Sequence, residues 1–305
     1  MRNTAKIVLL CGQLSFAGLL HAQAPSPTIA AGFGPGLSSE ELARLSQTPG
    51  AKGDQQRHYY FEAAKKEMPY RLYVPQSYDK KKKTPLVLAL HGYSGNQNYF
   101  FSFVKNLQEL CDRYGFIYVA PLGYSTGSWY GAPLDVPGNL PRSSASSRPA
   151  APPPPAAPQV SPKSPEQEKH ERDLSEADVM NVLALVRQEY NIDSRRIYLM
   201  GHSMGGFGTY FLGQKYNDIW AAIAPMSGTM PGYDFQLDRL AKLPILVAAG
   251  STETATIAAA KAQVETMKTM GMTAEYVEIE GGTHLSMIGP TVPRIFEFFG
   301  KQRKP

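Results

Sequence analysis

The chain of 305 residues contains only two cysteines, Cys11 and Cys111. Two thiols cannot supply a disulfide framework or a cysteine-rich zinc site. Past the N-terminal segment no apolar run approaches the roughly 18–20 residues that a membrane-spanning helix needs, which excludes a multi-spanning membrane protein. The net charge is only +5 and the charges are dispersed, so charge gives no indication of nucleic-acid binding. Folding must depend on an apolar core, which a chain of this length and 43% hydrophobic content can form.

The sequence also lacks the motifs of common metal and cofactor sites. It has no His-Glu-x-x-His segment, no paired cysteines and no phosphate-binding glycine loop. We therefore predict a protein that uses no metal or cofactor and has no nucleic-acid partner.

Residues 1–24 have the pattern of an export signal. Two basic residues precede a mostly apolar stretch over 7–20, and Ala22-Gln23-Ala24 offers a small-residue cleavage site. The stretch is too short to span a membrane, so we expect no stable membrane anchor. The mature protein is predicted to be secreted or periplasmic. Residues 25–53, rich in proline, glycine, serine and alanine, are predicted to form a flexible extension.

From about residue 54, strand-like segments alternate with helical patterns. The predicted strands cover residues 56–63, 70–75, 86–90, 116–120, 197–200, 221–226, 245–249 and 274–279. The predicted helices include one with Phe100, Phe103, Val104, Leu107 and Leu110 on a single face, one starting at Ser175, one passing through Tyr210 and Leu212, and one over residues 255–270. This alternation predicts an α/β fold, a mostly parallel sheet with helices on both faces.

A proline-rich segment interrupts this pattern. Nine of the 25 residues from Pro141 to Pro165 are proline, and most of the others are serine or alanine. Such a stretch buries too little apolar surface to offset the entropy of ordering it. Because the elements on either side do not appear complete alone, we predict a disordered insertion over about residues 138–172 within one domain of residues 54–305. A linker between two domains is the alternative.

The strongest chemical signal is Gly201-His202-Ser203-Met204-Gly205-Gly206, which lies between a predicted strand and a predicted helix. Glycines two residues either side of the serine permit a sharp turn that lifts the Ser203 hydroxyl above the sheet edge, at a helix N-terminus. The sequence therefore predicts that Ser203 is a nucleophile. A glycine-rich turn without chemistry is the plain alternative.

A serine hydroxyl needs a base to take its proton, and the six histidines offer one good candidate. Only His284 follows Ser203 at a distance, directly after a predicted strand, and loops after parallel strands gather at one edge. The others are set aside by position: His21 lies in the export signal, His58 in the opening hairpin, His170 in the insertion, His91 directly after a strand, and His202 beside the serine with its side chain expected to point away.

An acid should orient His284 and stabilise its charged form. The chain order expected for this architecture is serine, acid, histidine. Glu253 is the only carboxylate in the loop after the strand over 245–249, so it is the first candidate. Asp234, after the preceding strand, is the reserve, with Asp238 beside it.

Backbone amides complete the predicted site. The segment His91-Gly92-Tyr93 follows a fully apolar strand. The backbone N–H groups of Tyr93 and Met204 are predicted to form an oxyanion hole, a pair of donors for the negative oxygen that develops during acyl transfer. A tight turn that merely requires Gly92 is the alternative.

These segments resemble the α/β-hydrolase family, in particular bacterial esterases grouped with feruloyl esterases and polyhydroxybutyrate depolymerases. The resemblance spans about residues 70–299. It is carried by Tyr70-Arg71-Leu72-Tyr73-Val74-Pro75, by Leu88-Ala89-Leu90-His91-Gly92, and by the run from Ile192-Asp193 to Gly206. The likeness implies ester hydrolysis through an acyl-enzyme on Ser203 with His284 as base. The family usually carries an aspartate where this chain has Glu253.

The resemblance also bears on substrate. Only about 17 residues separate Met226 from Pro244, where many relatives place a large cap domain, so we expect no large cap. An open cleft would suit small-molecule or polymer-linked esters with aromatic, feruloyl-type or polyester-type acyl groups. Residues assigned to substrate binding are His91, Trp129, Tyr130 and His202, with Tyr93 as a further possible lining residue.

Two other functions remain open at this point. A serine peptidase of the prolyl oligopeptidase type shares the serine turn, although no propeller repeat or acidic pair precedes the domain. A non-catalytic binding protein on the same scaffold is the other. The first predicts cleavage of a proline-linked amide, and the second predicts that Ser203→Ala changes nothing.

Overall fold

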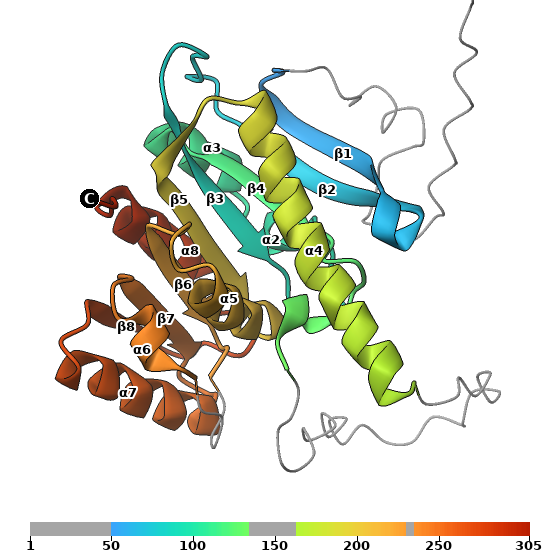
Figure 1. Ribbon diagram of the computed structural model, residues 1–305. Helices are drawn as coiled ribbons and strands as arrows, with labels where there is room; N and C mark the ends of the chain where they lie inside the picture. The colour runs from blue at the N-terminus through green and yellow to red at the C-terminus, as the bar shows by residue number, and fades with distance from the viewer. Residues whose placement is uncertain (1–49, 134–162, 230–234) are drawn as a thin grey trace, which may run out of the picture. The chain divides into compact units, whose positions relative to one another are not determined.

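The computed structural model describes residues 50–133, 163–229 and 235–305 (Figure 1). The chain divides into two compact units between Phe33 and Gly34, and all of the described residues belong to the second unit. The predicted export signal, nearly all of the N-terminal extension, residues 138–162 of the predicted insertion and Asp234 lie outside the described residues.

An eight-stranded sheet forms the centre of this unit. Its strands are β1 (Gly53–Phe61), β2 (Lys66–Val74), β3 (Thr84–Leu90), β4 (Ile117–Pro121), β5 (Ile192–His202), β6 (Ala222–Met226), β7 (Ile245–Gly250) and β8 (Ala274–Ile279). The order across the sheet is β1-β2-β4-β3-β5-β6-β7-β8. β1 pairs antiparallel with β2 and β2 with β4, and all the later pairs are parallel. The predicted α/β-hydrolase fold with a mostly parallel sheet is thereby confirmed.

The central strands are apolar because helices cover them on both sides. Every residue of β3 is buried, as is every residue of β4 and β6. In β3, Leu86 lies beside Ile117 of β4 and Ile197 of β5. Parallel strands buried on both faces are typically such continuous apolar runs.

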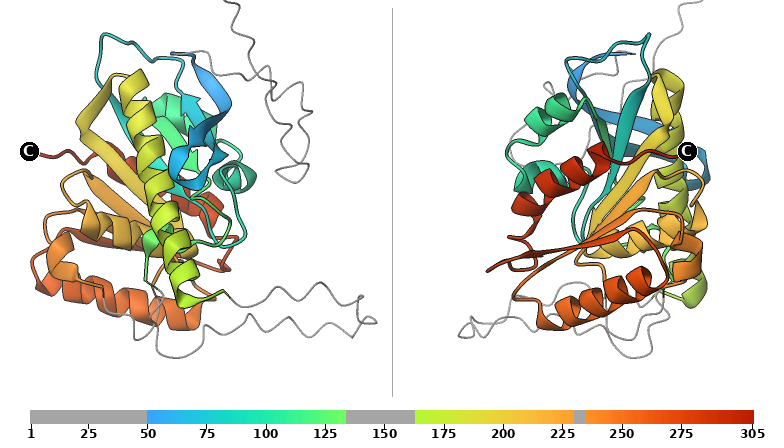
Figure 2. Two further views of the ribbon diagram at one scale, coloured as in Figure 1. Left: turned by 45° about the vertical axis from the view of Figure 1, so that its right-hand side comes forward. Right: turned by 90° about the vertical axis from the view of Figure 1, so that its left-hand side faces the viewer.

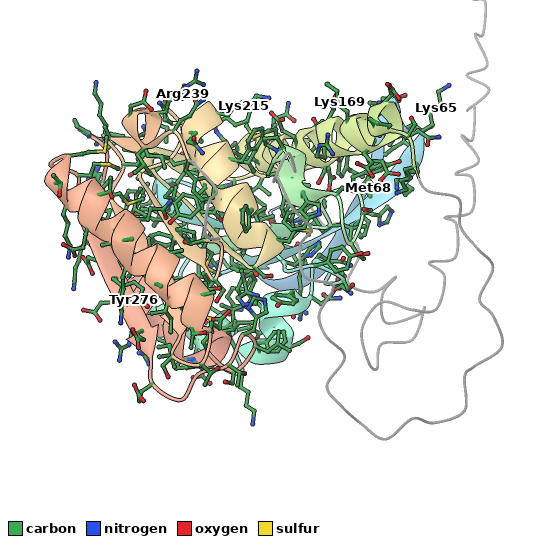
Figure 3. All side chains as sticks on the ribbon, turned by 90° about the horizontal axis from the view of Figure 1, so that it is seen from below. Lys65, Met68, Lys169, Lys215, Arg239 and Tyr276 are labelled. Carbon is green, nitrogen blue, oxygen red and sulfur yellow. The ribbon has the colours of Figure 1, made fainter. Side chains whose placement is uncertain are left out.

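Two helical layers enclose the sheet (Figure 2). One contains α4 (Pro165–Glu189), α5 (Met204–Lys215), α6 (Leu237–Leu240) and α7 (Thr254–Thr269), and the other contains α2 (Tyr99–Phe103), α3 (Leu107–Tyr114) and α8 (Ile288–Gly300). Lys169, Lys215 and Arg239 project outwards from α4, α5 and α6 on one side (Figure 3). Each layer packs its own apolar cluster against the sheet, with Val182 of α4 in one and Phe296 of α8 in the other.

The predicted insertion is wrong at its C-terminal end, because residues 165–172 belong to α4. The helix begins at Pro165, capped by Ser164, whose side chain accepts from the backbone N–H of Gln167. The Gln167 side chain in turn accepts from the backbone N–H of Ser164. This reciprocal capping box, with proline in the first turn, outweighs the lack of apolar residues there. Ser175, predicted to start the helix, is instead buried within it.

The helix predicted over residues 100–110 is two helices. α2 ends at Phe103, and Val104 is extended with φ −120° and ψ 90° before α3 begins at Leu107. The apolar spacing continues across the break, so periodicity alone did not reveal it. Phe100, Val104, Leu107 and Leu110 nevertheless share one apolar cluster, as the spacing predicted.

Cys111 is a free, fully buried thiol in α3, where it packs as a small apolar core residue. Across residues 50–133, 163–229 and 235–305, no helix combines the length and apolar character needed to cross a bilayer.

Candidate active site

The side chains singled out from the sequence meet at the edge of the sheet where the parallel strands end. Ser203 follows β5, Glu253 follows β7, and His284 follows β8. Figure 3 looks towards this edge. Carboxyl ends of parallel strands commonly form such sites, because their loops converge from separate parts of the chain.

Ser203 lies in a strained turn between β5 and α5. Its backbone has φ 56° and ψ −116°, outside the conformations that side-chain-bearing residues normally adopt. The flanking glycines are required by close packing: a Cβ on Gly201 would lie 2.2 Å from the Gly205 carbonyl oxygen, and one on Gly205 would lie 2.1 Å from that of Leu90. The Ser203 amide donates to the Met226 carbonyl at 2.8 Å, which fixes the turn to β6.

Ser203, His284 and Glu253 form one chain of hydrogen bonds. The Ser203 Oγ lies 2.9 Å from Nε2 of His284, and the other ring nitrogen, Nδ1, lies 2.5 Å from Oε1 of Glu253. The His284 side chain is 48% exposed, whereas that of Glu253 is only 9% exposed. The imidazole is therefore accessible from solvent while its carboxylate partner is enclosed.

Glu253 is held at the N-terminus of α7 by several donors. Its Oε2 accepts from the Ser227 hydroxyl at 2.7 Å and from the Gly250 amide at 2.9 Å. Burial acts to raise the pKa of the Glu253 carboxyl, but the hydrogen bonds from His284, Ser227 and Gly250 outweigh it and lower that pKa below its ordinary value. Glu253 is therefore an ionised acceptor near neutral pH.

The ionised carboxylate determines the tautomer of His284. A carboxylate only accepts hydrogen bonds, so Nδ1 of His284 carries the proton and donates it to Glu253. Nε2 then has a lone pair directed at the Ser203 hydroxyl, which donates to it. This arrangement can take a proton from the hydroxyl and stabilise the charged imidazole that results.

The loop that carries His284 is tied to the loop after β7. Both the amide and the hydroxyl of Thr252 donate to the Gly282 carbonyl, at 3.1 and 2.9 Å. The Thr283 amide donates to the Ser286 hydroxyl at 2.9 Å, closing the turn around His284. The acid and the base are therefore held by one connected pair of loops.

The amide of Tyr93 lies in the loop after β3 and that of Met204 at the start of α5, and these two segments pack together. Gly205 of α5 lies against the carbonyls of Leu90 and His91. Met204 is the first residue of α5, where an amide has no partner within its own helix. Neither amide donates a hydrogen bond to any residue that the structure describes. The loop around Tyr93 is fixed by a bond from the Ser94 amide to the Thr126 carbonyl, at 2.8 Å.

Three of the four residues predicted to bind substrate are buried, which contradicts a direct contact. His91 has its two ring nitrogens 2.7 Å from the carbonyls of Gly92 and Leu122, and burial lowers its pKa. The Tyr130 hydroxyl donates to the His91 carbonyl at 3.0 Å. His202 is also fully enclosed. Their polar atoms are satisfied within the protein, so these side chains organise loops instead of facing the site.

Trp129 and Tyr93 remain candidates for contact with substrate. Trp129 is half-buried and packs edge-on against Phe207 of α5, with ring centroids 5.7 Å apart. Tyr93 is 66% exposed, and its ring lies so close to Gly127 that a Cβ there would be 2.9 Å from it.

Two residues that contribute hydrogen bonds to the site were not predicted from the sequence. Ser227 follows β6 and binds Glu253; its place after a parallel strand was the available signal. Tyr99 begins α2 and binds His202, but its apolar neighbours made it resemble a core residue. Among the residues that the structure describes, no group of three or more histidine, cysteine, aspartate or glutamate side chains could hold a metal ion.

Comparisons with known proteins identify a family and relatives for this chain. The family model named Esterase matches residues 62–286. A bifunctional acetylxylan esterase/xylanase, XynS20E, from Neocallimastix patriciarum is 28% identical over 145 residues, 48% of this chain and 16% of that protein. Feruloyl esterase B of Neurospora crassa is 28% identical over 160 residues, 51% of this chain and 42% of that protein. The chain thus spans less than half the length of these curated relatives.

A solved structure extends the likeness to the fold. The ferulic acid esterase AmCE1/Fae1A from Anaeromyces mucronatus superposes with a TM-score of 0.55 at 18% identity, covering 85% of this chain and 94% of that one. At this identity the likeness concerns the fold alone. The family match covers most of the described domain and includes Ser203, Glu253 and His284. The chain therefore belongs to the esterase family of α/β-hydrolases.

Proposed function

We propose that this protein hydrolyses carboxylic esters through an acyl-enzyme on Ser203. The observation that carries the proposal is the hydrogen-bond chain from Ser203 through His284 to Glu253. The His284 Nε2 accepts the hydroxyl proton while Ser203 Oγ bonds to the acyl carbon, and the former carbonyl oxygen becomes negatively charged. The bond to the alcohol oxygen then breaks as His284 returns the proton to that oxygen.

The second half of the reaction restores the enzyme. Water gives a proton to Nε2 of His284 as its oxygen attacks the acyl carbon, and the bond to Ser203 Oγ breaks as that proton passes to Oγ. The Tyr93 and Met204 amides donate to the negative oxygen in both halves; loss of one such donor typically costs about 3 kcal/mol. Glu253 keeps His284 oriented and offsets its positive charge.

Aromatic or feruloyl-type acyl esters, or polyester-type ones, are the proposed substrates. Two features support this class. The curated relatives are named feruloyl esterase and acetylxylan esterase. At the site, the His284 side chain is about half exposed and Tyr93 is mostly exposed, which suits an ester joined to a bulky or polymeric group. Export is proposed as well, from the signal-like pattern of residues 1–24.

Labelling with an organophosphonate tests the nucleophile. Mass spectrometry of the labelled protein should place the adduct on Ser203, and an adduct elsewhere refutes the assignment. A panel of esters that differ in acyl length and aromaticity then ranks the substrates. Turnover of a proline-linked peptide amide without turnover of p-nitrophenyl esters would overturn the proposal in favour of a peptidase.

Replacing the nucleophile gives the simplest prediction. Ser203→Ala should reduce kcat/KM on a p-nitrophenyl ester by about 10³-fold or more, because nucleophile and base act as one unit. Ser102→Ala, which removes an exposed hydroxyl in α2, is the matched control and should keep full activity. Unchanged kcat/KM in the Ser203 variant would refute Ser203 as the nucleophile.

A further inference from the structure

His202, the residue before the proposed nucleophile, bonds to the backbone of the proposed base. Its Nε2 lies 2.7 Å from the carbonyl oxygen of His284, and its Nδ1 lies 2.8 Å from the hydroxyl of Tyr99. The side chain has no exposed surface. One buried ring, on the residue next to Ser203, therefore links α2 to the loop after β8.

Ring packing supports the same link. The His202 and His284 rings have centroids 4.6 Å apart, and the His202 ring stacks on Tyr99 at 5.8 Å. Gly92, beside the proposed oxyanion donor Tyr93, lies over this pair: a Cβ on Gly92 would be 2.8 Å from the Tyr99 hydroxyl and 3.3 Å from Nδ1 of His202. Three loops of the site thus meet around one side chain.

The two hydrogen bonds determine the tautomer of His202. A carbonyl oxygen only accepts, so the bond to His284 requires the proton on Nε2. In the neutral ring Nδ1 then has a lone pair, and the Tyr99 hydroxyl donates to it. Without that hydroxyl, the proton could move to Nδ1 and leave the Nε2 lone pair facing the lone pairs of the carbonyl.

We propose that His202 is a positioning residue. Its Nε2–H fixes the His284 backbone in the position from which the His284 ring reaches Ser203. Tyr99 maintains the tautomer of His202 that this hydrogen bond requires. This role rests on the proposed esterase function and deepens it. His202 contacts no substrate and transfers no proton. It acts only through the placement of His284.

A neutral His202 suits this role. Burial, followed by the charge on His284, lowers the pKa of His202 to about 3. His202 therefore adds no positive charge beside the His284 ring when that ring takes the proton of Ser203. A cation at this distance would oppose the step that the site performs.

Two amide replacements separate the hydrogen bond from mere bulk. The side-chain nitrogen of glutamine reaches as far as Nε2 of histidine, whereas that of asparagine reaches only as far as Nδ1. We expect His202→Gln to keep kcat within about threefold of the unmodified protein, and His202→Asn to lower kcat about tenfold or more with KM unchanged, the loss expected for one buried hydrogen bond. Equal kcat in the two variants, or a change confined to KM, would overturn the proposal.

A variant of Tyr99 tests the positioning role of His202 independently. Tyr99→Phe removes the donor to Nδ1 and should lower kcat several-fold. In a protein that already carries His202→Asn, the same Tyr99→Phe change should lower kcat little further. The matched control is Tyr73→Phe on β2, away from the site. It removes a hydroxyl that donates to Asp112 of α3 and should leave kcat unchanged. If either His202 variant fails to fold, Tyr99→Phe decides alone: a kcat equal to that of Tyr73→Phe overturns the proposal.

Labelling and kinetics together test the proposed function and the positioning role of His202 separately. Organophosphonate labelling of the unmodified protein tests the nucleophile, and failure at Ser203 refutes the proposed function and this inference with it. Labelling at Ser203 combined with equal rates for His202→Gln and His202→Asn refutes the positioning role alone.

Discussion

At the residue scale, Glu253 is the feature in which this site departs from the enzymes it resembles, which usually carry an aspartate there. Glu253 is the N-cap residue of α7, and its side chain spans from that helix to Nδ1 of His284. The additional methylene provides this reach while Oε2 remains bonded to Ser227 and Gly250. The length of the acid is therefore matched to its position in this chain.

Substitutions of Glu253 separate its charge from its length. Glu253→Gln should lower kcat about 10³- to 10⁴-fold, because an amide can present its N–H to Nδ1 and favour the wrong tautomer of His284. Glu253→Asp keeps the charge but withdraws the carboxylate by one methylene, so we expect a smaller loss of about 10²-fold. Steady-state kinetics on a p-nitrophenyl ester measures both.

The control for Glu253 lies on the surface of the same region. Glu265→Gln, on the exposed side of α7, should leave kcat unchanged, since the Glu265 carboxylate bonds to Lys268 of its own helix. A Glu253→Gln variant with kcat within threefold of the unmodified protein would show that another group orients His284.

Much of the site could be anticipated from residue positions, because each candidate followed a predicted strand. Ser203, Glu253 and His284 do lie within hydrogen-bonding distance of one another. His202 was expected to point away from Ser203, but the partners of His91 and His202 could not be anticipated. These partners come from other segments, Leu122 for the first and Tyr99 for the second, and nothing in the local sequence specifies those pairs.

At the element scale, predictions succeeded where the periodicity was complete within one segment. The strand predicted over 274–279 is β8, and the helix predicted over 255–270 is α7, Thr254–Thr269. The predictions failed where local backbone conformation and hydrogen bonding, rather than hydrophobic spacing, determine where a helix begins or ends. The start of α4 at Pro165 depends on the capping box of Ser164 and Gln167, and the break before α3 lies at the extended residue Val104. Apolar periodicity reports neither.

The turn between β5 and α5 gives a test at this scale. Gly205→Ala places a Cβ 2.1 Å from the Leu90 carbonyl oxygen, a backbone atom that cannot rotate away. We expect the free energy of unfolding to fall by about 3 kcal/mol or more, because either α5 or β3 must shift. The rate of organophosphonate labelling should fall as well, since the same shift moves Ser203. Denaturant titration and timed mass spectrometry provide the two measurements.

Gly115→Ala is the comparison for this variant. Gly115 ends α3 with φ 65°, and a Cβ there meets nothing within 4 Å. Only backbone strain of about 1–2 kcal/mol is expected, without any effect on labelling. Equal stabilities and labelling rates for the two variants would show that the close approach of Gly205 to Leu90 does not constrain the site.

At the scale of the described domain, helix α4 organises a loop that is distant in sequence. The Asp178 carboxylate accepts from the amides of Gly123 and Tyr124, at 2.7 and 3.0 Å, and from the hydroxyl of Tyr59 on β1 at 2.6 Å. Ser175 donates to the Gly123 carbonyl at 2.6 Å. This loop continues to Trp129, so α4 determines where a candidate substrate contact lies. Such long-range polar contacts leave no periodic trace in the sequence.

The domain also buries groups whose protonation differs between the folded and unfolded chain. Burial lowers the pKa of His202 to about 3, whereas an unfolded histidine has a pKa near 6.5. Below about pH 6.5 the unfolded chain therefore binds a proton that the folded chain does not, so stability is present above this pH and is lost as pH falls towards 3. Glu253, whose pKa is lowered from its ordinary value, adds a further loss at lower pH.

The contribution of His202 to acid sensitivity can be isolated by its glutamine variant. Between pH 7 and pH 4.5 the linkage amounts to about 2–3 kcal/mol of unfolding free energy in the unmodified protein. His202→Gln has no titrating group at this position, so its stability should fall by that much less over the same range, whatever its stability at pH 7. Denaturant titrations at a series of pH values give the two curves. Parallel curves would mean that His202 is protonated in the folded state, in which case its Nδ1 could not accept from Tyr99.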